Sequence, residues 1–372
     1  MAVHADLERV RAAAAAVIDP EIGRPLGELG MIGDVSVARG GRVRLQLRLT
    51  TGSCPLAEEL RGSVDAAART VAGVRSVHID IATMPPRERA ELAEHLARTT
   101  APLTGALGTD ATQIYAVASG KGGVGKSSVS ANLAAALAAS GKRVGLLDAD
   151  VWGYSIPQLF GVRRTPVAFG EMMLPVPAHG VALMSIGFFV SEDQPVVWRG
   201  PMLHKALQQF VTDTYWGTLD ALFVDLPPGT GDATLSLLQL LPATTLLAVT
   251  TPQATARIVA TRVARMAADA GIPIAGVIEN MSVAECPQCR SHTAIFGTGG
   301  GAQLAEEAGA PLLGHVPLDL ALRNAADEGT PVVIKAPTAS SARELIRIAA
   351  ALPTPRRALA GQSLPLAVVG AN

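Results

Sequence analysis

The sequence predicts an α/β protein with a mainly parallel sheet flanked by helices, preceded by a small α/β domain. Two observations support this prediction. From residue 113 onward, short apolar runs of strand length alternate with longer segments of helical pattern, which is typical of a parallel sheet with helices on both faces. Before residue 87, a shorter pattern of helices and strands is set apart by a proline pair.

The composition is that of a globular protein. The 372 residues are 49% hydrophobic and 17% charged, with a formal net charge of −1. This balance provides no field that would attract nucleic acid or an anionic membrane, and no apolar run is long enough to span a bilayer. The first residues lack the basic and apolar regions of a signal peptide, and three cysteines do not form a secreted disulfide framework. We expect two domains in a cytoplasmic protein without nucleic-acid or membrane partners.

The first domain is expected over residues 1–86 and is followed by a linker over 87–112. The predicted elements of the domain are a helix at 6–17, strands at 34–37 and 43–49, a helix at 55–71 and a strand at 77–81. The linker begins with a charged, helical stretch at 87–98 and continues with a segment rich in Pro, Thr and Gly at 99–108.

The second domain is expected over residues 113–352, and residues 353–372 form a loose tail. Its predicted strands are 115–118, 144–147, 222–224, 246–249, 276–278 and 313–316. Ligands bind beyond the carboxyl ends of the strands in such sheets. We therefore expect the site among the residues that close these strands, which are Gly120, Asp148, Asp225, Thr250, Glu279 and Pro317.

A glycine-rich segment after the first of these strands predicts phosphate binding. In order, its residues are Gly120, Lys121, Gly122, Gly123, Val124, Gly125, Lys126 and Ser127, followed by Ser128 in a predicted helix at 127–139. The segment fits the pattern G-x-x-x-x-G-K-[ST], in which backbone N–H groups converge on one anionic centre. Lys126 would then reach the terminal phosphates and the Ser127 hydroxyl would ligate Mg²⁺. We expect a site for a nucleoside triphosphate, in which Lys121 is a surplus cation.

Three aspartates at strand ends are predicted to surround the phosphates. Asp225 closes an apolar strand, a pattern that supports Mg²⁺, and a Pro- and Gly-rich turn suited to sensing the γ-phosphate follows at 227–232. Asp148 and Asp150 are two residues apart, so in an extended segment they share a face and both point towards the phosphates. Asp150 is predicted to orient the attacking water and Asp148 to support Mg²⁺ or its water. Ordinary solvated turns are the alternative for both segments.

These motifs together resemble a known family. The segment 120–127 is similar to the deviant Walker A motif of the P-loop ATPases that include MinD, ParA, the nitrogenase iron protein and the Mrp/ApbC group. Further stretches resemble the Mrp/ApbC members specifically, and the resemblance extends from residue 115 to about residue 352. These stretches are 148–157, 225–232, 278–281, 295–297 and 313–318.

The resemblance implies a role for individual residues. Lys121 would cross a dimer interface to the partner's phosphates and stabilise charge there, as an arginine finger does. Together with Lys126 it would act in ATP hydrolysis, while Asp150 positions the water. Asn280, at a strand end, would contact the adenine, with the Pro317 segment nearby.

Cys286 and Cys289 form a C-x-x-C pair in a predicted surface loop. This spacing lets both sulfurs face one metal ion or cluster, although redox pairs share it. A [4Fe-4S] cluster or a tetrahedral Zn²⁺ takes four protein ligands, so a two-fold dimer would supply the four thiolates on its axis. In the Mrp/ApbC family the pair is understood to bind a bridging iron–sulfur cluster, and zinc or bare thiols remain as alternatives. We interpret the neighbouring His292 as a solvated loop residue, because the cysteines already satisfy the ligand count.

The segments 19–22, 30–32 and 49–56 resemble a small domain that is fused to, or associated with, iron–sulfur assembly proteins. Within it, Cys54 is predicted to lie at a helix N-terminus, where the helix dipole lowers the pKa of a thiol. The alternative for Cys54 is a small buried residue.

The leading hypothesis is a homodimeric, ATP-hydrolysing carrier that binds an iron–sulfur cluster and transfers it to apo-proteins. One alternative is a positioning ATPase of the MinD/ParA kind, which needs a basic amphipathic C-terminal helix or a basic DNA-binding face. Residues 340–352 carry only Arg343 and Arg347 as basic residues. A second alternative is an ATP-driven redox protein, whose cluster ligands are distributed differently from an adjacent C-x-x-C.

Overall fold

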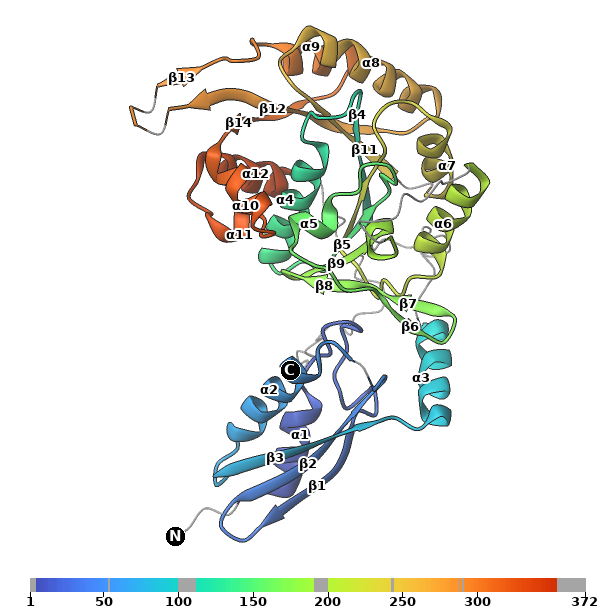
Figure 1. Cartoon of the computed structure of the whole chain (residues 1–372), viewed down its shortest axis with the longest axis vertical. Coiled ribbons are helices and arrows are strands. Elements are labelled where there is room, and N and C mark those ends of the chain that lie inside the picture. Colours follow the sequence, from blue (N-terminus) through green and yellow to red (C-terminus); the bar gives the residue numbers. More distant parts are fainter. Residues whose placement is uncertain are drawn as a thin grey trace, which may run out of the picture.

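The chain folds into two α/β units that are joined by a helix (Figure 1). The structure is a computed structural model of residues 1–372, and it describes residues 5–52, 54–99, 112–190, 200–241, 244–286, 288–289 and 291–352. The smaller unit is built on a three-stranded sheet and the larger unit on a nine-stranded sheet.

The small unit contains the five elements that the sequence predicts, with ends that differ by up to two residues. They are α1 (Leu7–Ala15), β1 (Ile32–Ala38), β2 (Arg42–Leu49), α2 (Ala57–Arg69) and β3 (Ser76–Thr83). The central strand β2 is antiparallel to β1 and parallel to β3. Val43, Leu45, Leu47 and Leu49 are buried while their neighbours along β2 are more exposed. Because side chains alternate along a strand, one face of this sheet is buried against the helices.

Helix α3 (Pro86–Thr99) leads from the small unit towards the large one. It confirms the helical connector predicted at 87–98, and it begins at Pro86, a position where proline's missing N–H has no cost. The remainder of the predicted linker, residues 100–111, and the predicted tail, residues 353–372, lie outside the described residues.

The large sheet confirms the mainly parallel architecture. Its strands are β4 (Gln113–Ser119), β5 (Val144–Asp148), β8 (Val176–Ala178), β9 (Val181–Ser185), β10 (Ala221–Asp225), β11 (Thr244–Thr250), β12 (Ile274–Glu285), β13 (His292–Thr293) and β14 (Leu312–Leu318). Their order is β13-β12-β11-β4-β10-β5-β9-β8, and β14 pairs with β12. All strand pairs are parallel except β8–β9 and β12–β13. The six predicted strands are present, whereas β8, β9, β13 and the separate hairpin of β6 (Val167–Phe169) and β7 (Met172–Leu174) were not predicted.

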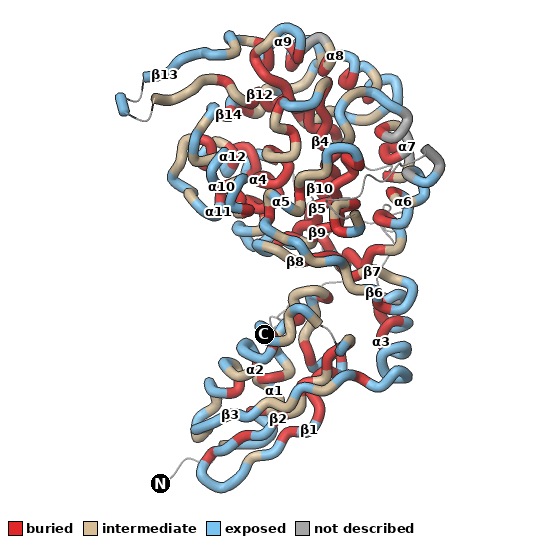
Figure 2. The backbone as a smooth tube through the Cα atoms, in the orientation of Figure 1, coloured by how far each residue is buried: buried red, intermediate tan, exposed pale blue. Residues whose placement is uncertain are grey.

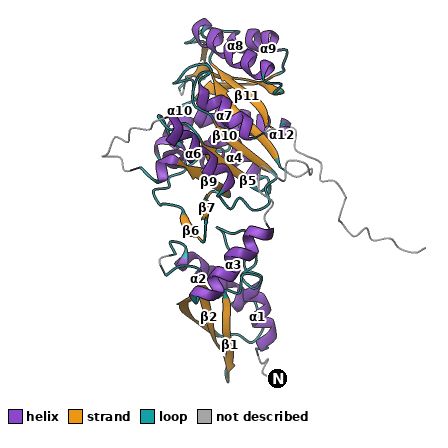
Figure 3. Ribbon diagram, turned by 90° about the vertical axis from the view of Figure 1, so that its right-hand side faces the viewer, coloured by secondary structure: helices purple, strands orange, loops and turns teal. Residues whose placement is uncertain are grey.

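Helices cover both faces of the large sheet (Figure 3). They are α4 (Lys126–Ala139), α5 (Ile156–Leu159), α6 (Gly200–Thr212), α7 (Asp232–Leu240), α8 (Ala254–Asp269), α9 (Gly300–Ala308), α10 (Leu320–Asp327), α11 (Val332–Lys335) and α12 (Ser340–Ala351). Along β4, Tyr115 and Val117 join the cluster built around α4 and α12, whereas Ile114 and Ala116 join the cluster formed with α6, α7 and α8. No helix among the described residues is long and apolar enough to cross a bilayer.

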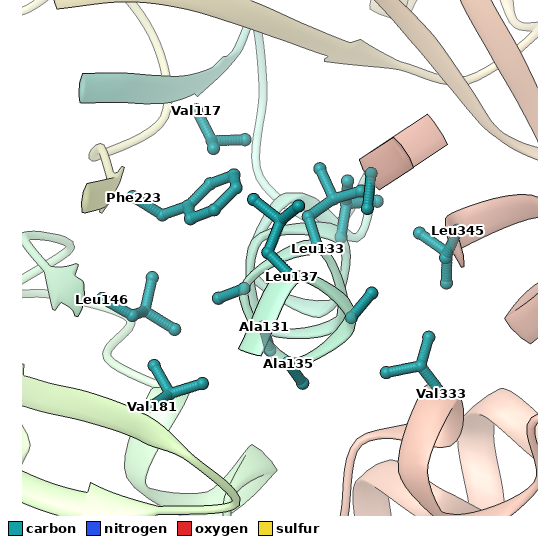
Figure 4. Packing of buried hydrophobic residues seen from close by; sticks show 14 of the residues in the cluster. Val117, Ala131, Leu133, Ala135, Leu137, Leu146, Val181, Phe223, Val333 and Leu345 are labelled. Atoms are coloured by element: carbon teal, nitrogen blue, oxygen red, sulfur yellow. The ribbon is translucent and has the colours of Figure 1, made fainter. Parts of the chain in front are cut away.

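Helix α4 lies at the centre of one of these layers and is buried on nearly all sides (Figure 4). Leu133 and Leu137, which the sequence places on one helical face, pack with Phe223 of the sheet, while Leu345 of α12 belongs to the same cluster. Buried residues are concentrated along the central strands and α4 (Figure 2). The helix that begins at the phosphate loop is thus held by the largest core cluster of the chain.

Truncation of this core tests the packing. Leu133→Ala should lower the free energy of unfolding by about 2–5 kcal/mol, because it removes buried methyl groups and leaves a cavity. Leu320→Ala, at a side chain that is 52% exposed in the same unit, should change it by less than about 1 kcal/mol. Urea denaturation followed by circular dichroism measures both, and equal losses would contradict the described packing.

Candidate nucleotide site and cysteine pair

The phosphate loop connects β4 to α4, and contacts explain two of its glycines. A Cβ on Gly120 would lie 2.2 Å from the backbone nitrogen of Ala260 in α8, so only glycine fits at that position. Gly125 is the N-cap of α4 with a φ of 82°, and a Cβ there would lie 2.2 Å from Asn280 Nδ2. The loop therefore passes directly into a helix that begins at Lys126, and the N-terminal N–H groups of a helix attract anions.

A cavity of about 640 Å³ lies against this loop, a size within the range of small-molecule sites. It is lined by residues 121–128, by residues 150–153 after β5, and by Pro227, Pro228 and Gly231 after β10. The fold thus brings together the three segments in which the sequence predicts phosphate-binding residues.

Asp225 links the charged groups at the start of α4. Its Oδ2 atom lies 2.7 Å from Lys126 Nζ and accepts a hydrogen bond of 2.5 Å from the Ser127 hydroxyl, while its Oδ1 atom lies 2.6 Å from Ser130 Oγ. Lys126 is also 3.8 Å from Asp150 Oδ2. The Ser127 hydroxyl and the Asp225 carboxylate are adjacent oxygen donors of the kind that Mg²⁺ prefers, so these residues fit the predicted ion.

Asp148 does not take the predicted position beside the phosphates. It is fully buried, and its Oδ2 atom accepts hydrogen bonds from the backbone N–H groups of Ser155 and Ile156 and from the Ser185 hydroxyl. Strand β5 ends at Asp148, and the cavity is lined by Asp150 but not by Asp148. Burial, together with the neighbouring Asp225, raises the pKa of Asp148 to about 7. The Asp148 side chain therefore holds the segment after β5, and its support of Mg²⁺ or of a metal-bound water stays a prediction.

Asp150, in contrast, lines the cavity as the sequence predicts. Burial raises the pKa of its carboxyl group, although the nearby Lys126 ammonium opposes that effect. The carboxylate also accepts a hydrogen bond of 3.2 Å from the backbone of Gly153. Asp150 is therefore a buried carboxylate that lines the cavity beside Lys126.

Two residues at the cavity or its rim were missed by sequence reasoning. Lys121 donates a hydrogen bond of 3.2 Å to the side chain of Gln253. Gln253 is the N-cap residue of α8, and its side chain makes no capping hydrogen bond. Thr234 lines the cavity, and its buried hydroxyl has no hydrogen-bond partner among the described residues. No motif points to Gln253, whereas the Gly-rich turn before Thr234 was a usable signal.

Asn280 and Pro317 lie on neighbouring strands. Asn280 Nδ2 donates a hydrogen bond of 2.8 Å to the carbonyl of Val124 in the phosphate loop, and its buried Oδ1 atom has no partner among the described residues. Asn280 pairs with Val316, which precedes Pro317. Pro317 lines a second cavity of about 790 Å³, together with Glu279 and other residues. The geometry leaves the predicted adenine contact of both residues as a prediction.

The two cysteines lie at the tip of an arm that projects from the sheet (Figure 1). Strand β12 pairs antiparallel with β13 beyond the sheet, and Cys286 follows the last residue of β12. The Cys289 sulfur lies 3.1 Å from Ser291 Oγ, and hydrogen bonds from Ser291 and from the Cys286 thiol lower the pKa of Cys289 to about 7. His292 is exposed on β13, and the described residues contain no group of three or more potential metal ligands. One chain therefore offers two exposed or half-buried thiols and no complete metal site within the described residues.

Cys54 differs from its prediction. It is half-buried three residues before α2, and burial raises the pKa of its thiol, although a hydrogen bond from the backbone of Leu56 opposes the rise. Desolvation therefore outweighs the helix N-terminus, which corrects the expectation of a lowered pKa.

Comparisons with known proteins identify relatives of both units. Residues 110–353 match the family described as NUBPL iron-transfer P-loop NTPase, and residues 7–81 match the family described as iron-sulfur cluster assembly protein. The iron-sulfur cluster carrier protein of Mycobacterium leprae is 45% identical over 371 residues, covering 97% of each chain. The protein of that name from Mycobacterium tuberculosis is 46% identical over 365 residues and 96% of each chain.

A solved structure agrees with the fold. A nucleotide-binding protein from Archaeoglobus fulgidus, in complex with ADP, is 34% identical with a TM-score of 0.53, over 64% of this chain and 92% of that chain. The chain therefore belongs to the NUBPL iron-transfer P-loop NTPase family and carries an N-terminal unit of the iron-sulfur cluster assembly protein family.

Proposed function

We propose that this protein is a homodimeric carrier that binds an iron–sulfur cluster between two copies, hydrolyses ATP and transfers the cluster to apo-proteins in the cytoplasm. The observation that carries the proposal is the pair Cys286 and Cys289 at the tip of an arm on a phosphate-binding fold. The curated relatives that match nearly the whole chain are named iron-sulfur cluster carrier proteins, which supports the same cargo.

The residues of the phosphate loop have distinct tasks in this proposal. The Lys126 ammonium moves from Asp225 to the terminal phosphate oxygens, and the Ser127 hydroxyl and Asp225 hold Mg²⁺. When bound, the ion neutralises developing charge on the phosphates. Asp150 orients the attacking water from its place beside Lys126. The Asn280 Oδ1 atom, which has no hydrogen-bond partner within the described ranges, can accept a hydrogen bond from the amino group of adenine, which favours ATP over GTP.

The cargo site requires a second copy of the chain. A cluster ligated by four thiolates takes two from each chain on a two-fold axis. The lowered pKa of Cys289 favours the thiolate, which is the form that binds metal. Soft thiolates suit iron–sulfur clusters and zinc alike, and the relatives favour the cluster.

The same dimer gives Lys121 a task. In a dimer closed around nucleotide, this lysine leaves Gln253 and reaches the phosphates of the partner subunit. Breaking one partly buried hydrogen bond from a charged group costs about 1.5–3 kcal/mol, which charge–charge attraction to phosphate can exceed. Gln253 therefore restrains Lys121 without preventing its release.

Removal of both thiols tests the cargo. After anaerobic reconstitution with iron and sulfide, the unaltered protein should hold about four irons per dimer and transfer them to an apo-ferredoxin. Cys286→Ser with Cys289→Ser should hold almost none while still binding ADP, and Cys54→Ser is the matched control that should keep the cluster. Iron and sulfide analysis with absorption spectroscopy measures this. A brown dimer from the double variant would show that the ligands are elsewhere.

Removal of Lys121 tests the trans role. Lys121→Ala should lower kcat for ATP hydrolysis at least about tenfold and change the ADP dissociation constant less than about threefold. The reason is that the lysine charge stabilises the partner's phosphates chiefly in the transition state of hydrolysis. Lys126→Ala should instead weaken ADP binding itself. Steady-state phosphate release and calorimetric titration provide the two readouts, and an unchanged kcat in Lys121→Ala would remove this role.

The Cys289 thiol should titrate with a midpoint near its lowered pKa of about 7 in protein without metal. Ser291→Ala removes the side-chain hydrogen bond that contributes most to stabilising the thiolate, so the midpoint of Cys289 alkylation should move to higher pH and the reaction at neutral pH should slow. Ser140→Ala, at the end of α4, is the control. Peptide mapping by mass spectrometry after iodoacetamide pulses follows Cys289 by itself. A midpoint that stays in place would refute the contribution of Ser291.

A further inference from the structure

The small unit is attached to the large unit by more than the chain connection. The β6–β7 hairpin of the large unit inserts Phe169 and Leu174, both 1% exposed, into the apolar cluster of the small unit. Leu96 of α3 belongs to that cluster, and a Cβ on Gly170 would lie 3.2 Å from Ala93 of α3. The two labelled strands lie beside the end of α3 in Figure 1. The hairpin thus shares a core with the N-terminal unit.

An ion pair completes this contact. Arg164 Nη1 lies 3.0 Å from Glu21 Oε1, and the side chains are 22% and 7% exposed. A second guanidinium nitrogen donates to the carbonyl of Pro177 at 3.4 Å. Burial raises the pKa of Glu21, and the Arg164 charge opposes that rise. Losing Arg164 would leave a largely buried carboxylate without its counter-charge, which is unfavourable. We call the Glu21–Arg164 pair and the β6–β7 hairpin the interdomain joint.

Cys54 lies next to this joint on the side of the small unit. Its side chain packs against the cluster that contains Phe169 and Leu174. Glu21, Asp19 and Arg164 all act on its thiol electrostatically, so a residue of the large unit is part of its surroundings. Leu56, two residues further on, lines a cavity of about 730 Å³ between the two units, together with Glu21 and Trp216. The Cys54 thiol thus lies beside residues that form the joint.

The joint is connected along the chain to the nucleotide cavity. The segment that leads to Arg164 begins at Asp150, and the buried Asp148 fixes its backbone at Ser155 and Ile156. On the far side, the backbone of Met173 bonds to Asp213 and Tyr215, which follow α6. Helix α6 in turn contacts α7, the helix after the turn that closes the nucleotide cavity. Two segments that line the nucleotide cavity are therefore connected to the hairpin, one along the chain and the other through α7 and α6.

Nucleotide binding acts on the first of these segments through Lys126. Phosphate oxygens compete with Asp150 and Asp225 for the Lys126 ammonium, so the attraction that holds Asp150 beside Lys126 at 3.8 Å weakens. Closely packed elements shift together because protein interiors are dense. The ion pair is formed and the thiol is half-buried in this structure, so the change available to the joint is to loosen.

We propose that the interdomain joint is a nucleotide-sensitive latch over Cys54, which loosens when ATP occupies the phosphate loop and thereby exposes the thiol. This rests on the nucleotide-binding part of the proposed function and adds a regulatory connection from that site to the N-terminal unit. The latch couples the state of the phosphate loop to a thiol in a different domain, independently of the arm that carries Cys286 and Cys289.

The three cysteines of the chain permit a direct test, because Cys286→Ser with Cys289→Ser leaves Cys54 as the sole thiol. In that full-length protein, the rate of iodoacetamide alkylation is measured across pH, with and without a non-hydrolysable ATP analogue and Mg²⁺. The rate at high pH, where the thiol is fully ionised, reports access, and the midpoint reports the pKa. Arg164→Met breaks the ion pair, Arg164→Lys keeps the charge, and Arg163→Met removes an exposed neighbouring arginine as the matched control.

The analogue should raise the limiting alkylation rate of Cys54 at least about threefold, and Arg164→Met should reach a similar rate without nucleotide and lose the response. Arg163→Met should behave like the parent and Arg164→Lys should recover part of the response. A purely electrostatic role of Arg164 would move only the midpoint, upward, and would overturn the latch. If Arg164→Met does not fold, Glu21→Gln removes the other charge of the same ion pair and should give the same result.

Nucleotide affinity measured in the same samples separates this proposal from the proposed function. If the analogue binds and the limiting rate stays constant, the latch is wrong while the carrier proposal stands. If the analogue does not bind, the proposed function fails at its first step, and an unchanged limiting rate in Arg164→Met then also overturns the joint as a barrier to Cys54.

Discussion

The buried carboxylate of Asp225 is the interaction on which the nucleotide site depends. It ends the central strand β10 with no exposed surface, and its oxygens contact the ammonium of Lys126 and the hydroxyls of Ser127 and Ser130. A carboxylate removed from water needs such partners, since an unpaired buried charge is highly unfavourable. The first turn of α4 is therefore fixed to the sheet by charge at one end and by the apolar packing of Leu133 and its neighbours along its length. The position of the phosphate loop follows from these two constraints.

Much of the fold could be predicted because its signals are local. Buried parallel strands such as β4, β5 and β10 read as short apolar runs, and the alternation with helices identifies the architecture. The strands that were missed lie in the hairpin or in the outer parts of the large sheet, where β8 and β13 are ends of the strand order and β9 is next to β8, and they are two to five residues long. Strand β8 even contains Pro177, which argues against a strand in sequence analysis. Such strands exist because of the partner beside them, and pairing between distant segments has no periodic signature.

The residues of the site could likewise be predicted where their signal is local. The glycines, Lys126 and Ser127 are set by a motif whose geometry is local, so the sequence places them beside the cavity that the structure contains. Asp148 was expected to face the phosphates together with Asp150, but β5 ends at Asp148, and the alternation of side chains along a strand predicts nothing beyond that point. Gln253 was missed because it reaches the loop only through a tertiary contact, whereas Thr234 follows a Gly-rich turn whose signal was not used. For Cys54, the sign of its pKa shift depends on how deeply the folded chain buries the thiol, which the sequence alone does not contain.

Strand β12 connects the phosphate loop with the cysteine pair. Strand β12 carries Asn280, which donates to the phosphate loop at Val124, and it ends directly before Cys286. Between these points Met281 adopts a φ of 56°, and the pairing with β14 changes register before Ala284. A left-handed residue other than glycine costs free energy and persists only where the surrounding contacts enforce it. The change of backbone direction at Met281 allows one continuous strand to contact the phosphate loop through Asn280 and to leave the sheet as an arm a few residues later. The loop and the thiols consequently cannot be positioned independently, because a change in the backbone at Val124 acts on the same strand that sets the direction of the arm.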